Sequence, residues 1–140
     1  MGVQQLTINL SDIESGSDIG FVINGVDAGD YSGSSVSSAG DVNGDGIDDV
    51  IIGASNAAPN GEAYSGSTYV VFGTSDNDAI ELSDIESGTG GFVINGVDEF
   101  DISGVSVSAA GDVNGDGLDD VIIGALYADP NGSDSGSAYV

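Results

Sequence analysis

Two stretches of the chain carry oxygen-bearing side chains at alternate positions around a pair of glycines. Calcium takes six to eight oxygen ligands, and position 7 of such a loop commonly binds through its backbone carbonyl. Gly44 and Gly46 permit the tight turns that point these oxygens inward. The first stretch therefore predicts a calcium loop with the ligands Asp41, Asn43, Asp45, Ile47 and Asp49. Ile47 would bind through its backbone carbonyl.

The second stretch repeats the pattern with Asp112, Asn114, Asp116, Leu118 and Asp120. An EF-hand begins similarly, but it requires Glu at position 12 and a helix after the loop. Ile52 and Ile123 stand at position 12, and the residues around them are β-branched. A polar turn without a metal is the simpler alternative. Two copies with a complete ligand set favour two Ca²⁺ per chain over that alternative.

The composition restricts what the chain can bind. It has 24 Asp and Glu residues, no Lys, Arg or His, and a formal charge of -24. No side-chain salt bridge can form, so bound cations or salt must relieve the self-repulsion. Without a basic residue the chain cannot neutralise phosphates, which excludes a nucleic-acid partner. The same argument excludes binding to an anionic membrane surface, unless calcium bridges the chain and the membrane.

Other classes are excluded by what the sequence lacks. There is no cysteine, which excludes a disulfide framework and a cysteine-based zinc site. No apolar run approaches the length of a transmembrane helix, and residues 1–5 lack the features of a secretory signal. The many Gly, Ser, Asp and Asn residues indicate turns, and the shortage of strong helix formers predicts little helix.

The chain is built from an internal repeat with a period of about 71 residues. Residues 20–54 align with 91–125 without gaps. The similarity extends in both directions, to a shared Leu-Ser-Asp-Ile-Glu-Ser-Gly segment and a shared Ser-Gly-Ser-x-Tyr-Val segment. We predict one repeat domain over 1–140, with repeat 1 at about 10–81 and repeat 2 at about 82–140.

Each repeat is predicted to form four short antiparallel strands. Residues 50–54 are continuously apolar, so both faces of that strand should be covered. A sheet that is apolar on both faces must stack against copies of itself, and the radial solution is a β-propeller. The predicted fold class is therefore all-β, with two four-stranded propeller blades per chain. The first blade spans about 33–97, and the second spans 104–140 and is completed by 20–26.

These residues resemble the FG-GAP repeats of integrin α-subunit propellers and their bacterial relatives. The resemblance covers nearly the whole chain. It is most specific in Asp-x-Asn-x-Asp-Gly-x-x-Asp running into Val-Ile-Ile-Gly-Ala, and in Tyr-Val-Val-Phe-Gly. It implies that each loop joins the first two strands of a blade and binds Ca²⁺ through the residues named above. Ser32-Gly33 and Ser103-Gly104 stand where the family often has Phe-Gly, so the name-giving motif is only partly present.

The resemblance implies a non-enzymatic calcium-binding module with an adhesion, surface or assembly role, outside the cell or at its surface. Its ligand would be an unidentified protein or glycan. The alternative is a scaffold propeller within a larger secreted enzyme. The absence of His, Cys and Lys removes the usual bases and nucleophiles and favours the first reading.

The remaining acidic residues receive plainer interpretations. A glycosidase-like carboxylate pair is disfavoured, because the loops already use the best-placed carboxylates. Asp48 and Asp119 are expected to face solvent. The Ser-Asp-Ile-Glu-Ser-Gly segment is interpreted as a solvated connection in preference to a second cation site.

The two-blade arrangement predicts assembly with copies of the same chain. Two blades span too small an arc to close, and an open edge exposes unpaired backbone groups. A ring follows in which residues 20–26 of one chain complete the last blade of its neighbour, a heterologous contact that closes by cyclic symmetry. The usual range of four to eight blades favours a trimer with six blades or a tetramer with eight.

Overall fold

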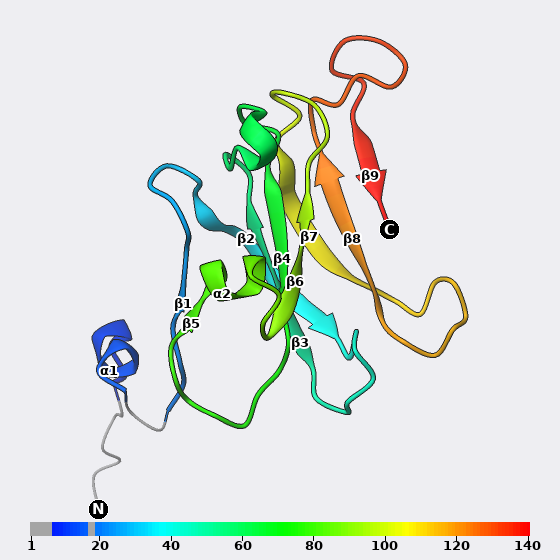
Figure 1. Ribbon diagram of the computed structural model, residues 1–140. Helices are drawn as coiled ribbons and strands as arrows, with labels where there is room; N and C mark the ends of the chain where they lie inside the picture. Colours follow the sequence, from blue (N-terminus) through cyan, green and yellow to red (C-terminus); the bar gives the residue numbers. More distant parts are fainter. Residues whose placement is uncertain (1–6, 17–18) are drawn as a thin grey trace, which may run out of the picture.

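The computed structural model describes residues 7–16 and 19–140. Its regular structure is chiefly antiparallel sheet, with a few short helices between the strands (Figure 1), which confirms the predicted all-β fold class of blade-like sheets. The strands of the two larger sheets are β2 (Ser32–Gly40), β3 (Asp49–Ala54), β4 (Ser67–Val71), β6 (Gly91–Asn95), β7 (Ser103–Gly111), β8 (Asp120–Ala125) and β9 (Ser137–Tyr139). The smaller elements are α1 (Leu10–Glu14), β1 (Ile23–Asn24), a 3₁₀ turn at Pro59–Gly61, β5 (Ile80–Glu81) and α2 (Leu82–Glu86).

The first large sheet, here called blade 1, has the strand order β2-β3-β4-β6 with every neighbour antiparallel. Its two middle strands are buried on both faces, as their continuous apolar sequences require. Ile51 and Val70 point to one face, while Ile52 and Tyr69 point to the other. The second sheet, blade 2, has the order β7-β8-β9, so β9 is an edge strand among the described residues.

The two blades pack against each other through small residues. Ile51 and Val70 of blade 1 form one apolar cluster with Ile123 of blade 2. A methyl group on Gly53 would overlap the carbonyl oxygen of Gly104, and the Ser35 hydroxyl donates to that same oxygen at 2.6 Å. The blades approach this closely because β2 and β7 consist largely of Gly, Ser and Ala. This close contact fixes one blade relative to the next.

The other face of blade 1 is covered by α2. Leu82 and Ile85 are 0% and 2% exposed and pack against Ile52 and Tyr69. The Tyr69 hydroxyl donates to the Glu86 carboxylate at 2.7 Å. Our prediction of a solvated connection was wrong for this copy of the segment, because Leu and Ile three residues apart share one face of a helical turn.

The N-terminal strand pairs within its own chain. β1 is parallel to β5, with Ile23 opposite Ile80, and the Ile80 amide donates to the Val22 carbonyl at 2.9 Å. Ile23 also packs against the apolar cluster beneath α2. In Figure 1, β1 runs beside β5, and α1 stands apart from the sheets. Completion of a neighbour's blade by residues 20–26 stays a prediction.

The helices of the structure are short. Within residues 7–16 and 19–140, none has the length and apolar character needed to cross a bilayer.

Candidate metal centre

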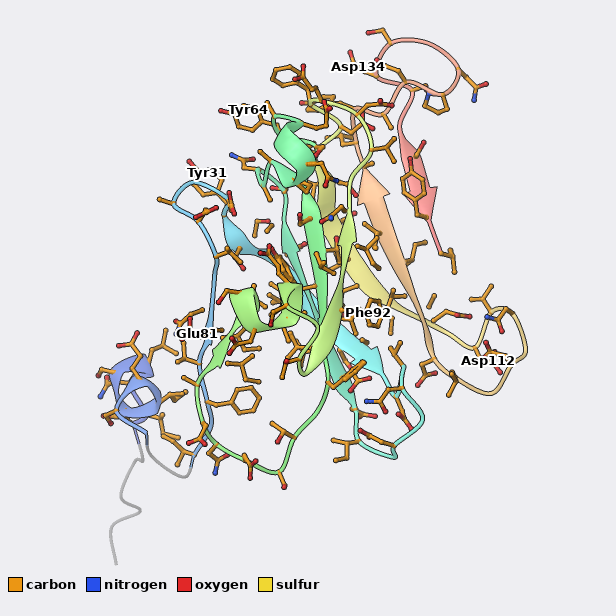
Figure 2. All side chains as sticks on the ribbon, viewed as in Figure 1. Tyr31, Tyr64, Glu81, Phe92, Asp112 and Asp134 are labelled. Atoms are coloured by element: carbon orange, nitrogen blue, oxygen red, sulfur yellow. The ribbon has the colours of Figure 1, made fainter. Side chains whose placement is uncertain are left out.

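Both predicted calcium loops connect the first two strands of a blade. Residues 41–48 join β2 to β3, and residues 112–119 join β7 to β8. The two loops emerge at the same end of the sheets, the lower end in Figure 1, and Figure 2 shows Asp112 on the second of them. The repeated sequence therefore places two similar oxygen-rich loops side by side in the fold.

The first aspartate of each loop organises the turn that follows it. In the first loop, Asp41 Oδ1 accepts hydrogen bonds from the amides of Gly44 and Asp45 at 2.8 and 3.0 Å, and Oδ2 accepts one from Gly46 at 2.9 Å. These three amides all lie on the inner side of the turn. Asp112 makes the corresponding bonds to Gly115, Asp116 and Gly117 at 2.7, 3.0 and 3.0 Å.

The next two polar side chains cap the backbone two residues ahead. Asn43 Oδ1 accepts from the Asp45 amide at 2.8 Å, and Asp45 Oδ1 accepts from the Ile47 amide at 2.9 Å. Asn114 and Asp116 repeat both contacts at the same distances. This alternation is why oxygen-bearing side chains recur at every second position of the loops.

The last aspartate differs between the loops. Asp49 is 1% exposed, and its carboxylate accepts from the Val42 amide at 3.0 Å and from the Gly73 amide at 2.8 Å. It thus ties the loop to the end of β4. Asp120 is half-buried and accepts from the Val113 and Asn114 amides, both within its own loop.

The donor set fits a hard divalent cation in type. Each loop offers three carboxylates, one amide oxygen and the carbonyl of an exposed Ile47 or Leu118. A carboxylate has about four lone-pair sites, so one that accepts two or three amide hydrogens keeps acceptor capacity. In the described residues, however, no three acidic side chains converge at the spacing of a metal site. The ten ligand assignments and the number of ions stay predictions.

One acidic residue outside the predicted ligand sets links the two loops. Asp119 Oδ2 accepts from the Asp41 amide at 2.9 Å, and the Asp119 amide donates to the Asp41 carbonyl at 3.2 Å. The expectation that Asp119 faces solvent was therefore wrong, whereas Asp48, its counterpart in blade 1, is exposed. The two residues are 78 positions apart in the sequence. The one local sign of a second role was the pair of adjacent aspartates, Asp119 and Asp120, at the end of the loop.

Two further carboxylates are perturbed away from the loops. Burial raises the pKa of Asp101, which is 6% exposed, and the nearby Asp98 charge raises it further. Burial likewise raises the pKa of Asp30, its counterpart in repeat 1, with added repulsion from Asp27 and Glu86. Asp101 and Asp30 lie just before the first residues of β7 and β2. Their raised pKa values show that burying negative charge is unfavourable in a chain that has no basic residue.

Comparison with known proteins identifies the repeat. A family model described as FG-GAP repeat matches residues 32–71 and 103–140. The chain is also similar to integrin alpha pat-2 of Caenorhabditis elegans, with 37% identity over 116 residues. That match covers 80% of this chain but 9% of the relative, so the chain spans less than a tenth of the curated protein it resembles.

Proposed function

Since the chain belongs to the FG-GAP repeat family, we propose that it is a non-enzymatic calcium-binding propeller module. The observation that carries the proposal is the paired construction of the two loops. In each loop, three backbone amides donate hydrogen bonds to the first aspartate, and four further oxygen-bearing ligand candidates follow in the same loop. Asp41, Asn43, Asp45, Ile47 and Asp49 would hold one Ca²⁺, and the equivalent five residues of blade 2 the other.

The proposed role of the ion is structural. Calcium would supply positive charge to a chain with 24 acidic and no basic residues, where self-repulsion opposes the compact state. The loop conformation itself is held by side chains of the loop. Asp41 and Asp112 fix the turn, and Asp49 anchors it to β4 through the Gly73 amide. A loop held in this way brings the flanking strands β2 and β3 together.

Calcium binding can be counted directly. Calorimetric titration should give two ions per chain, with dissociation constants on the order of 10⁻⁴ to 10⁻³ M, the range of extracellular modules. Asp45→Ala combined with Asp116→Ala should lower the stoichiometry towards zero. The matched control is Asp78→Ala, an exposed acidic residue outside both loops, which should leave it at two. Unchanged stoichiometry in the double variant would contradict the assignment.

Calcium should also stabilise the fold by mass action. An ion that binds only the folded chain at 100 times its dissociation constant stabilises by about 2.7 kcal/mol per site. Adding a chelator should therefore lower the melting temperature by roughly 10 °C or more, and excess Ca²⁺ should restore it. A melting curve that does not change with the chelator would refute a structural role.

We further propose an adhesion or surface role outside the cell. The support is the similarity to an integrin alpha subunit, although the chain matches only a small part of that protein. The partner would be a protein or glycan. A scaffold within a larger secreted enzyme is the second candidate, and the sequence of any flanking domain distinguishes the two. A flanking domain with a catalytic constellation would favour the scaffold.

The proposed module also assembles with copies of itself. Within the described part of the chain, blade 1 has four strands and blade 2 has three, and a trimeric or tetrameric ring would give every blade four strands. Mass measurement in calcium tests this: three or four times the mass of one chain is expected. A folded, monodisperse single chain would contradict it.

A further inference from the structure

We propose that the N-terminal arm of one copy (residues 10–16 and 19–24, which include α1 and β1) forms the outer layer of blade 2 in a second copy, where Glu14 accepts a hydrogen bond from Tyr139. The proposal rests on the proposed ring assembly and is independent of calcium binding. It adds a helix and a specific side-chain contact to the strand that the ring requires.

Blade 1 supplies the template within a single chain. Its outer layer is α2 followed by β6, and β6 pairs antiparallel with β4, Tyr69 opposite Val93. The Tyr69 hydroxyl donates to Glu86 at the end of α2 at 2.7 Å. The Ser67 hydroxyl also donates to Asn95 Oδ1 at 3.1 Å. A helix, a strand and two polar contacts thus close the outer side of this blade.

The N-terminal arm has the same sequence as that outer layer. Leu-Ser-Asp-Ile-Glu-Ser-Gly begins at both Leu10 and Leu82, and Gly-Phe-Val-Ile-Asn begins at both Gly20 and Gly91. The burial is nevertheless opposite, since Leu82 is 0% exposed and Leu10 is 79% exposed. The helix α1 buries none of its residues. The arm therefore presents the apolar residues of an outer layer without the blade that such a layer covers.

Blade 2 presents the matching acceptor. Its strand β9 has the sequence Ser-Ala-Tyr where β4 begins Ser-Thr-Tyr, and β8 is its one partner among the described strands. Tyr139 is 44% exposed, whereas Tyr69 is 1% exposed beneath α2. If the arm lies on β9 in the same way as α2 and β6 lie on β4, Tyr139 of one copy contacts Glu14 of the other.

The orientation of β1 leaves the required edge available. Along a strand, the backbone groups of successive residues point to opposite edges. Val22 points its carbonyl to β5, as its bond from Ile80 shows, so Phe21 and Ile23 point the other way. The counterparts of Phe21 and Ile23 in β6 are Phe92 and Ile94. These two residues point towards β4, because they alternate with the same spacing as Gly90 and Gly96, which bond to the residues that flank β4. The edge that β6 uses is thus the edge of β1 that faces away from β5.

The free faces of the two blades are complementary in the same arrangement. On blade 1, a pocket of about 640 Å³ lies between the arm and Val36, Val50 and Ile52. The counterparts of these residues, Val107, Val121 and Ile123, pack in the contact between the blades. On blade 2, Ile122 is 36% exposed, while its counterpart Ile51 is fully buried in that contact. A second copy seated head to tail would repeat the internal contact.

Cross-linking between single-cysteine variants tests the register. Blade 1 places Ser67 opposite Asn95, so Ser137 of one copy should lie opposite Asn24 of the next. The chain has no cysteine of its own. Asn24→Cys and Ser137→Cys chains, unfolded, mixed and refolded with Ca²⁺, should give a disulfide-linked pair on oxidation. Neither variant alone should cross-link, and Ser133→Cys, in an exposed loop, is the control for Ser137→Cys.

The outcomes separate this inference from the wider proposals. A ring mass without the 24–137 cross-link would overturn the arm placement and leave the ring intact. A single-chain mass would overturn both the arm placement and the ring, while the calcium stoichiometry is measured separately.

Two variants test the helix and the side-chain contact. Leu10→Asp should reduce the assembly to single chains that keep the circular dichroism of a folded β protein, whereas Leu82→Asp should abolish folding. Glu14→Ala should raise the dissociation constant of the assembly about tenfold, and it should have no further effect in a Tyr139→Phe background. Assembly unchanged by Leu10→Asp, or equal loss from Glu14→Ala in both backgrounds, would refute the contact.

Discussion

Blade 1 and blade 2 share nearly the same sequence but differ in burial. Tyr69 is buried while Tyr139 is exposed, and Ile51 is buried while Ile122 is exposed. The strands β7, β8 and β9 pair in the same order as β2, β3 and β4, although blade 2 buries less of its surface. Burial is supplied by the neighbours, namely α2 and β6 on one side and the next blade on the other. Paired substitutions at equivalent positions therefore measure what each neighbour contributes.

The largest difference in stability between equivalent variants of the two blades is expected at the glycines of β3 and β8. A methyl group on Gly53 meets the backbone of Gly104 in the other blade, whereas one on Gly124 meets the flexible Ser106 hydroxyl in its own blade. Gly53→Ala should destabilise by about 3 kcal/mol, and Gly124→Ala by about 1 kcal/mol or less. Denaturant unfolding of both variants gives the two values. Equal losses would show that blade-to-blade contact is not the determining factor.

The next difference concerns the last aspartate of each loop. Asp49→Asn replaces one of two acceptor oxygens that hold the Val42 and Gly73 amides in a buried position, which should cost about 2 kcal/mol. Asp120→Asn acts on a half-buried carboxylate and should cost less. Unfolding should be followed with chelator present, so that calcium binding does not enter the comparison. A larger loss for Asp120→Asn would reverse the interpretation.

A smaller difference is expected for the tyrosines. Tyr69→Phe removes the donor to Glu86 beneath α2, with an expected loss of about 1 kcal/mol. Tyr139→Phe removes an exposed hydroxyl and should leave the unfolding free energy of the single chain unchanged. Thermal melts under conditions that keep the chain monomeric compare the two.

The smallest effect concerns pH. The raised pKa of Asp101 means that its proton is held more tightly in the folded chain, so its contribution to stability is present below an ordinary aspartate pKa of about 4. That contribution is lost as pH rises through the raised value. Asp101→Asn should therefore raise the melting temperature by about 2 °C at pH 7, and by almost nothing near pH 3.5. A gain that persists at low pH would argue against burial of the charge as its cause.

The sequence was sufficient for the fold class because the apolar run 50–54 and its copy can only be central strands, and because oxygen spacing in the loops is a local property. It was insufficient where distant segments meet. Helix α2 was missed since two apolar residues in Leu82–Glu86 give too little periodicity to detect. The bond from the Asp41 amide to Asp119 and the parallel pairing of β1 with β5 depend on how the repeats stack, which no local pattern encodes.

The Asp119 contact has a consequence for how the proposed calcium sites respond to each other. Asp119 precedes the last ligand of the second loop, and its carboxylate holds the amide of the first ligand of the first loop. An ion that orders the second loop would thereby lower the conformational entropy that the first loop loses on binding. We expect positive cooperativity, with a Hill coefficient above one that falls to one in Asp119→Ala. In a closed ring the exposed Asp48 would give each neighbouring pair of loops the same link. Because such coupling is reciprocal, an ion in one loop would favour binding in the loops on both sides of it.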